Sequence, residues 1–189
     1  GFSTKGSSYE IADITDTPVI LIVNCRGMSN SIGAVVKGYL GYEKNNNIKG
    51  VIFNNLSDRL YGNAARIVKD MGIEPLGYMP YKKNAVLESR HLGLVTSAEV
   101  EHFQEKINSI AEQMRESVDI EGILRIAENA SKLEAIHKSI DKKDVRIAVA
   151  KDEAFCFLYD DNIDYLRQCG CEIVYFSPLS HNRTALDNL

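Results

Sequence analysis

The chain has 189 residues, of which 44% are hydrophobic and 25% charged, a composition typical of globular proteins. Its net charge of −4 provides no basic surface for a phosphate backbone, which argues against a nucleic-acid partner. The longest apolar run, 18–23, is too short to cross a membrane, and the polar start of the chain lacks the apolar centre of a secretory signal. We therefore expect a cytoplasmic protein without a membrane partner.

The first half of the chain alternates between strand and helix patterns. Short apolar runs at 18–23, 50–53 and 75–79 predict strands, and the first run predicts a strand buried on both faces. Between them, the spacing of apolar residues predicts helices over 31–42 and about 58–71. Ser29 or Asn30 is expected to cap the first helix, and Gly72 to end the second. The order strand, helix, strand, helix, strand indicates right-handed βαβ units in a parallel sheet.

From residue 97 onward the pattern changes to amphipathic helices. We predict helices over about 97–117 and 120–130, the first with a packing stripe of Phe103, Ile107, Ile110 and Met114. A charged linker near residues 141–144 follows. The βα pattern then resumes with a strand at 145–150, a helix at 160–169 and a strand at 172–176. We predict two domains, 1–142 and 143–189.

The four cysteines, Cys25, Cys156, Cys169 and Cys171, do not have the spacing of a zinc knuckle or a thioredoxin site. Cys25 and Cys156 stand in strand or strand-end contexts, where a free cysteine usually packs as a small hydrophobic side chain. We therefore expect structural cysteines, with no disulfide implied.

Three segments, taken in order, resemble one family of enzymes. The first is Pro-Val-Ile-Leu-Ile-Val-Asn-Cys-Arg-Gly-Met-Ser-Asn-Ser at 18–31. The second combines 50–54 with Leu-Gly-Tyr-Met-Pro at 76–80 and Glu-Ser-Arg-His-Leu-Gly-Leu at 88–94. The third runs from Val145 through Asp-Glu-Ala-Phe-Cys-Phe at 152–157 to Phe-Ser-Pro-Leu at 176–179. Together they cover nearly the whole chain and are similar to the cobyrinic acid a,c-diamide synthase family.

This resemblance implies a two-part α/β architecture. Residues 1–142 are expected to be the later half of a parallel sheet with flanking helices, incomplete and similar to dethiobiotin synthetase and P-loop NTPases. Residues 143–189 are expected to begin a flavodoxin-like class I glutamine amidotransferase domain. The implied activity is a carbon–nitrogen ligase of cobalamin biosynthesis that uses ATP, Mg²⁺ and glutamine to amidate the a and c carboxylates of cobyrinic acid. The implied course runs through an acyl phosphate, which ammonia released from glutamine converts to the amide.

Two parts of such an enzyme are not found in these residues. None of the 13 glycines is followed by lysine, so a Walker A loop is missing. No cysteine stands in the glycine-flanked strand-to-helix turn that activates a glutaminase nucleophile. We therefore expect an internal fragment that has no catalytic or metal-binding residue of its own and is inactive alone. To survive with an exposed strand edge, such a piece would form a homodimer, swap elements with a neighbour, or be a proteolysed remnant that still resembles its parent.

Candidate nucleotide-binding residues follow the second and third strands. The resemblance implies that Asn54, at the carboxyl end of its strand, hydrogen-bonds the adenine of ATP, since an amide both donates and accepts. The alternative is an asparagine that only forms a turn. Pro80 either lines the same base or simply closes the strand.

Candidate substrate-binding residues follow the first and third strands. Arg26, Gly27 and Ser31 form a loop that runs into a helix N-terminus, which suits a carboxylate or an acyl phosphate. The alternative for Arg26 is a solvated turn residue. The resemblance implies that Glu88, Arg90 and His91 help to position the corrinoid, whereas a lone histidine is more often structural. Asp152, Glu153, Ala154 and Phe155 are expected to shape a domain contact or the edge of the glutamine site.

Two other functions fit the same sequence. A sister enzyme that acts on another macrocycle, such as a nickel sirohydrochlorin diamide synthase or cobyric acid synthase, fits the same motifs. A non-catalytic module, in which a P-loop-like sheet serves binding or dimerisation, fits the missing lysine equally well.

Overall fold

The computed structural model describes residues 4–43, 45–86, 100, 102–134 and 144–180. Two compact units divide the chain, the first at Gly1–Leu133 and the second at Glu134–Leu189. The boundary expected at 142/143 lies outside the described residues. Within the described parts, none of the helices combines the length and the apolar character needed to cross a bilayer.

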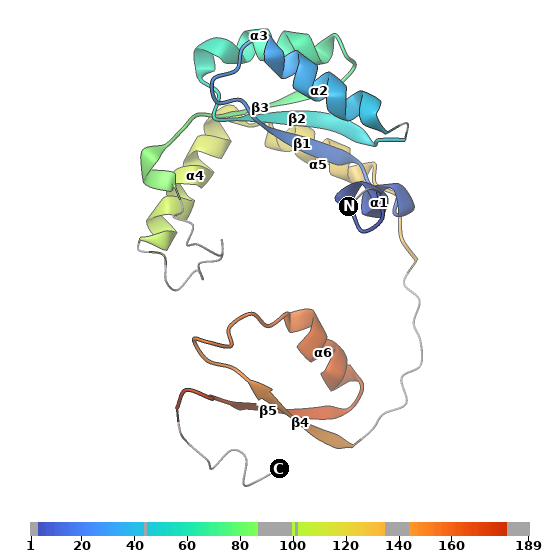
Figure 1. Ribbon diagram of the computed structural model, residues 1–189, viewed down its shortest axis with the longest axis vertical. Coiled ribbons are helices and arrows are strands. Elements are labelled where there is room, and N and C mark those ends of the chain that lie inside the picture. The colour runs from blue at the N-terminus through green and yellow to red at the C-terminus, as the bar shows by residue number, and fades with distance from the viewer. Residues whose placement is uncertain (1–3, 44, 87–99, 101, 135–143, 181–189) are drawn as a thin grey trace. The chain divides into compact units, whose positions relative to one another are not determined.

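The first unit is built on a parallel sheet with the strand order β1-β2-β3. Its strands are β1 (Val19–Asn24), β2 (Ile48–Asn54) and β3 (Glu74–Met79). Helices α2 and α3 cover one face of the sheet, and α4 and α5 lie on the other (Figure 1). The expected parallel α/β sheet with flanking helices is confirmed, because each strand is joined to the next through a helix.

The helices lie close to their predicted positions. Those of the first unit are α1 (Ser8–Ile14), α2 (Ser31–Tyr42), α3 (Asp58–Lys69), the 3₁₀ turn η1 (Lys83–Ala85), α4 (Phe103–Ser117) and α5 (Ile120–Glu128). Helix α1 was not expected, and the Ser7 hydroxyl caps it by accepting the Glu10 N–H. Helix α4 begins at Phe103, and the expected start at 97 lies outside the described residues.

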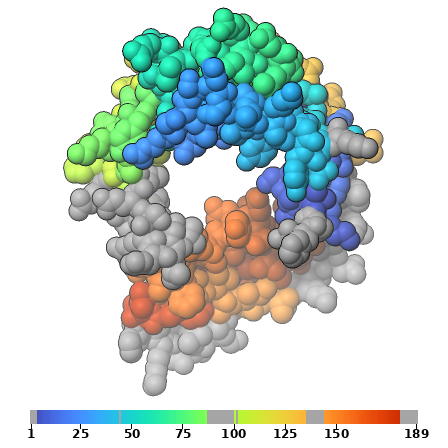
Figure 2. All heavy atoms as spheres, turned by 45° about the horizontal axis from the view of Figure 1, so that its top comes forward, coloured from blue at the N-terminus to red at the C-terminus, as the bar shows by residue number. Residues whose placement is uncertain are grey.

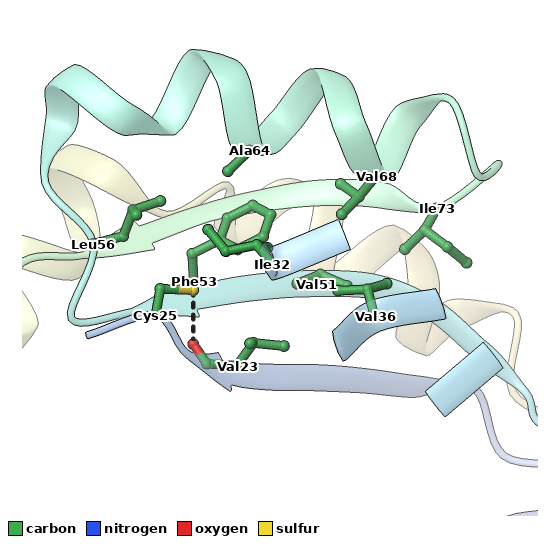
Figure 3. Packing of buried hydrophobic residues seen from close by; sticks show 10 residues of the cluster. All are labelled: Val23, Cys25, Ile32, Val36, Val51, Phe53, Leu56, Ala64, Val68 and Ile73. Carbon is green, nitrogen blue, oxygen red and sulfur yellow. Dashed lines mark hydrogen bonds between the residues drawn. The ribbon is translucent and has the colours of Figure 1, made fainter. Parts of the chain in front are cut away.

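A buried cluster joins the sheet to α2 and α3. Val51 and Phe53 of β2 pack against Ile32 and Val36 of α2 and against Val68 of α3 (Figure 3). Helices α2 and α3 contact each other, and the space-filling view shows them next to one another at the surface (Figure 2). These side chains are almost fully buried, so this layer contributes the largest share of apolar burial in the unit.

A smaller cluster lies on the opposite face of the sheet. Ile52 and Leu76 pack against Val118, the residue that follows α4, and against Ile126 of α5. The stripe expected on α4 contributes less than predicted: Met114 joins this cluster, whereas Ile107 is exposed and no residue of α4 is fully buried. Helix α4 therefore packs mainly through its C-terminal end.

Strand β1 is less buried than its apolar run predicted. Only β2 pairs with it among the described residues, so β1 is an edge strand. Ile22 is 67% exposed, whereas Ile52, its register partner on β2, is 9% exposed. A groove of about 1260 Å³ runs beside the other face of β1, between α1 and α2, and Tyr39 lines it instead of joining the core. The prediction of burial on both faces is therefore wrong for β1 in this chain.

The second unit contains a two-stranded parallel sheet. Strands β4 (Val145–Ala150) and β5 (Cys171–Phe176) are joined through helix α6 (Asp160–Gln168). Ile163 of α6 is the buried residue that the helix presents to the sheet. The bounds of all three elements agree with the sequence prediction to within one residue.

Candidate functional site

The strands of the first unit end together at one edge of the sheet. Asn24 of β1 pairs with Asn54 of β2, and Asn54 pairs with Met79 of β3. The segments that leave these strands therefore meet side by side, as expected for the carboxyl edge of a parallel sheet. We call Asn24, Arg26, Asn54, Asn55 and Tyr81 the carboxyl-edge cluster.

Backbone contacts fix the two asparagines at the end of β2. The Asn54 carbonyl accepts the Cys25 N–H at 2.7 Å, which joins the loop after β1 to β2. The Asn54 Oδ1 accepts the N–H of Asn55 at 3.0 Å, so the half-buried Asn54 side chain has a defined orientation. Asn55 has a φ of 57°, a left-handed conformation that asparagine adopts more readily than most residues.

A side-chain bond connects the loops after β1 and β2. The Asn55 Nδ2 donates to the Asn24 Oδ1 at 3.0 Å, and the Arg26 N–H donates to the same oxygen at 3.2 Å. Asn24 thus uses one side-chain oxygen to hold both a neighbouring strand end and the backbone of Arg26.

Arg26 and Gly27 form the turn between β1 and α2. Gly27 has a φ of 72°, which favours glycine, and the Met28 N–H closes the turn on the Cys25 carbonyl at 3.0 Å. The Arg26 side chain is exposed, and its guanidinium carbon lies 5.7 Å from the centre of the Tyr81 ring. This distance is within the range of cation–π attraction.

The start of α2 differs from the predicted cap. Ser31 is the first helical residue and is exposed at the carboxyl edge. Asn30 occupies the cap position but makes no capping bond; its Oδ1 instead accepts the Asn63 Nδ2 of α3 at 3.1 Å. The first N–H groups of α2 therefore have no side-chain cap from Asn30.

The structure brings five predicted site residues to one edge, namely Arg26, Gly27, Ser31, Asn54 and Pro80. Pro80 is half-buried directly after β3, beside the Met79 carbonyl that accepts the Leu56 N–H at 3.1 Å. Glu88, Arg90 and His91 lie outside the described residues.

Sequence reasoning missed three members of the carboxyl-edge cluster. Asn24 and Asn55 directly follow or extend the predicted strands, so amides at two strand ends were a usable signal. Tyr81 follows Pro80, but nothing in the sequence indicates that its ring meets Arg26, because the contact joins residues 55 positions apart.

The cluster suits a purine and a carboxylate better than a metal ion. The Asn54 amide presents a donor and a second acceptor lone pair, which are the groups that an adenine edge needs. In the part of the chain that the structure describes, no group of three or more histidine, cysteine or acidic side chains could hold a metal. The nearby Asp58 carboxylate accepts the Tyr78 hydroxyl at 3.0 Å.

In the second unit, Asp152 joins the loops that follow β4 and β5. Its Oδ1 accepts the N–H groups of Ala154 and Phe155, and its Oδ2 accepts the Ser177 hydroxyl and the Leu179 N–H, all within 3.0 Å. Desolvation raises the pKa of this carboxyl, but the four hydrogen bonds outweigh it and leave the pKa below 3.8. Asp152 thus fixes the two loops as an ionised acceptor.

The cysteines have different surroundings. Cys25 is buried, its thiol donates to the Val23 carbonyl at 3.3 Å, and burial raises its pKa to about 11. The structural interpretation of Cys25 is confirmed. Cys156 is exposed in the loop after β4, so the expectation that it packs as a small hydrophobic residue is wrong.

Comparison with known proteins finds relatives along the whole chain. The cobyrinate a,c-diamide synthase of Sulfurisphaera tokodaii is 38% identical over 100% of this chain and 43% of its own length. The synthases of the same name from Sulfolobus acidocaldarius and Limosilactobacillus reuteri are each 37% identical, over 95% and 96% of this chain and 41% of their own lengths. No family model and no solved structure matches. The chain is therefore similar throughout to cobyrinate a,c-diamide synthases and spans about two fifths of their length.

Proposed function

We propose that this chain is part of an ATP- and glutamine-dependent amide ligase that converts the a and c carboxylates of cobyrinic acid to amides. The observation that carries the proposal is the 37–38% identity to cobyrinate a,c-diamide synthases, which extends across both units of the chain. The shared name of these relatives favours cobyrinic acid over the other macrocycles.

The first unit would contribute the face that holds ATP and the reacting carboxylate. Asn54 supports the nucleotide role because its amide is half-buried, is oriented by the Asn55 N–H and stands at the carboxyl end of a central strand. Pro80, directly after the neighbouring strand, would lie against the same base.

Arg26, Gly27 and Ser31 would hold a substrate carboxylate. The guanidinium supplies parallel donors for such a group, and the N–H groups at the start of α2 supply partial positive charge. The carboxylate, once activated as an acyl phosphate, would react with ammonia from glutamine, releasing phosphate and leaving the amide. The second unit would begin the glutamine-hydrolysing domain. The described residues assign neither the Mg²⁺ ligands nor the glutaminase nucleophile.

The decisive experiment uses the complete polypeptide that contains this chain. It is incubated with cobyrinic acid, Mg-ATP and glutamine, and the products are separated by mass. We expect a singly and then a doubly amidated corrinoid, and no product when glutamine or ATP is left out. If cobyrinic acid stays unchanged under these conditions and nickel sirohydrochlorin is amidated in a parallel reaction, the nickel macrocycle replaces cobyrinic acid as the proposed substrate.

The Asn54 assignment has a separate test. Asn54→Asp keeps the size of the side chain but replaces the amide donor with a carboxylate. We expect the KM for ATP to rise about tenfold or more, because a buried or half-buried donor is lost and an anion is placed near the base. Asn63→Asp on α3 is the matched control. An equal KM for ATP in the two variants would remove Asn54 from the nucleotide site.

A further inference from the structure

The Arg26 side chain and backbone are held by residues from all three strand-end loops. We propose that Tyr81 and the Asn24–Asn55 pair are positioning residues, which fix Arg26 so that its guanidinium binds a substrate carboxylate end-on. This inference rests on the proposed function, since it names the group that Arg26 recognises. It adds three residues that sequence reasoning did not assign.

The backbone of Arg26 is held by a hydrogen bond to the Asn24 side chain. The Asn24 Oδ1 accepts the Arg26 N–H at 3.2 Å and, at the same time, the Asn55 Nδ2 at 3.0 Å. Asn55 holds the left-handed conformation directly after β2, where its side chain reaches across to β1. The loop that carries Arg26 is therefore hydrogen-bonded to the end of a second, paired strand.

The side chain of Arg26 is held by an aromatic ring. The guanidinium carbon of Arg26 lies over the Tyr81 ring, 5.7 Å from its centre. Attraction between a ring and a cation requires no hydrogen bond, so it leaves the N–H groups of the guanidinium available to bond a carboxylate with two parallel hydrogen bonds. Tyr81 thus reduces the conformational freedom of Arg26 without occupying its donors.

Among the described residues, no carboxylate competes with a ligand for the Arg26 guanidinium. Arg125, Arg146 and Arg167 each pair with a carboxylate within 3.0 Å. No such ion pair to Arg26 is present among the residues that the structure describes, although the side chain is exposed at the carboxyl edge. A guanidinium that contacts a ring and has no carboxylate partner among the described residues is suited to take one from a ligand.

The first experiment uses the 189-residue chain and citrate as the carboxylate probe. The Nε–H signal of Arg26 is followed by NMR in the wild type, Tyr81→Phe and Tyr81→Leu. Phenylalanine keeps the ring face, so we expect the same citrate affinity as the wild type. Leucine removes it, and we expect affinity about two- to fivefold weaker, the size of an exposed cation–π contact. Equal affinities in all three proteins, or no response of Arg26 to citrate, would overturn the proposal.

The second experiment uses the complete polypeptide and separates positioning from stability. Tyr81→Leu and Asn55→Gly, which keeps the left-handed backbone but loses the Nδ2 donor, should each raise the KM for the corrinoid and leave the KM for ATP unchanged. In an Arg26→Gln background, Tyr81→Leu should have no further effect. The proposal would be overturned if Tyr81→Leu raised the KM for the corrinoid as much in the Arg26→Gln background as in the wild type. It would also be overturned if the variants raised the KM for ATP alone.

The two experiments also distinguish this inference from the proposed function. Failure of cobyrinic acid amidation by the wild-type polypeptide would reject the function, whereas the citrate titration would still report whether Tyr81 positions Arg26 for a carboxylate. Conversely, active amidation with an Arg26→Gln variant whose KM for the corrinoid is unchanged would reject the inference and keep the function.

Discussion

The backbone of Gly77 lies against the carbonyl of Ser117, so closely that a Cβ added to Gly77 would stand 2.1 Å from the Ser117 oxygen. Gly77 also has a φ of 111°, an angle that residues other than glycine rarely adopt. The contact lets residues 117–119 run along the free edge of β3. There the Asp119 N–H donates to the Leu76 carbonyl at 2.9 Å, and the Ser117 hydroxyl donates to the Tyr78 carbonyl at 2.7 Å.

Gly77→Ala is expected to lower the free energy of unfolding of the first unit by about 2–4 kcal/mol, because it combines a backbone clash with a strained φ. Gly62→Ala is the matched control: Gly62 is in α3, and its added Cβ would meet nothing within 4 Å. We expect this control to stabilise the unit by about 0.5–1 kcal/mol. Urea unfolding followed by circular dichroism measures both, and a neutral Gly77→Ala would contradict the close packing of α4–α5 on β3.

Two isoleucines in register should respond differently to truncation. Ile52→Ala is expected to cost about 2–5 kcal/mol, since it leaves a cavity in the cluster with Leu76 and Val118. Ile22→Ala, on the exposed side of β1, should change the free energy of unfolding of this chain by less than about 1 kcal/mol. Urea unfolding of the two variants makes the comparison. A large cost at Ile22 would mean that another element covers β1 in solution.

Alkylation should distinguish the buried Cys25 from the exposed Cys156. With a pKa of about 11, Cys25 has roughly one thiolate in a thousand molecules at pH 8, and burial further limits access. We expect iodoacetamide to modify Cys156 first and Cys25 only after urea unfolds the first unit, as read by peptide mass spectrometry. Rapid modification of Cys25 in the native chain would show that the loop after β1 opens.

The Asp152 carboxylate should make the stability of the second unit sensitive to acid. Because the pKa of this carboxyl in the folded unit lies below its ordinary value, the carboxylate contributes its full stability at any pH above that ordinary value. The contribution is lost as the pH falls through the folded pKa. Asp152→Asn should weaken the loops at neutral pH and remove this acid dependence, whereas the exposed Glu153→Gln should not. NMR measurement of amide exchange at Phe155 and Leu179 tests both variants. Identical acid profiles for Asp152→Asn and the wild type would exclude the carboxylate as the cause.

Most of the fold could be predicted from local pattern. The apolar runs that became β2 and β4, and the periodic stretch that became α2, carry their signal within a few residues. The exposure of Ile22 could not be predicted, because an apolar run reports what a strand can bury and not which neighbours it has. Helix α1 was missed since its sequence is polar and short, and its stability depends on the Ser7 cap and on burial of Ala12.

The candidate site was only partly predictable. Asn54 and Arg26 follow apolar runs directly, and the rule that parallel strands end at one edge brings them together. The bond from Asn55 to Asn24 and the ring of Tyr81 over Arg26 depend on the register of three strands and on one left-handed residue. Such contacts join distant positions and leave no periodic signature in a single sequence.

The close contact at Gly77 has a consequence for how the sheet of the first unit can grow. The outer flank of β3 is occupied where Val118 bridges to Gly77, whereas β1 has no strand beyond it among the described residues. Among the described residues, β1 therefore presents an unpaired edge on which an incoming strand could form backbone hydrogen bonds. If that strand ran parallel to β1, its last residues would lie next to Asn24, at the same edge of the sheet as Arg26. Extension of this sheet and completion of its binding edge would then be the same structural event.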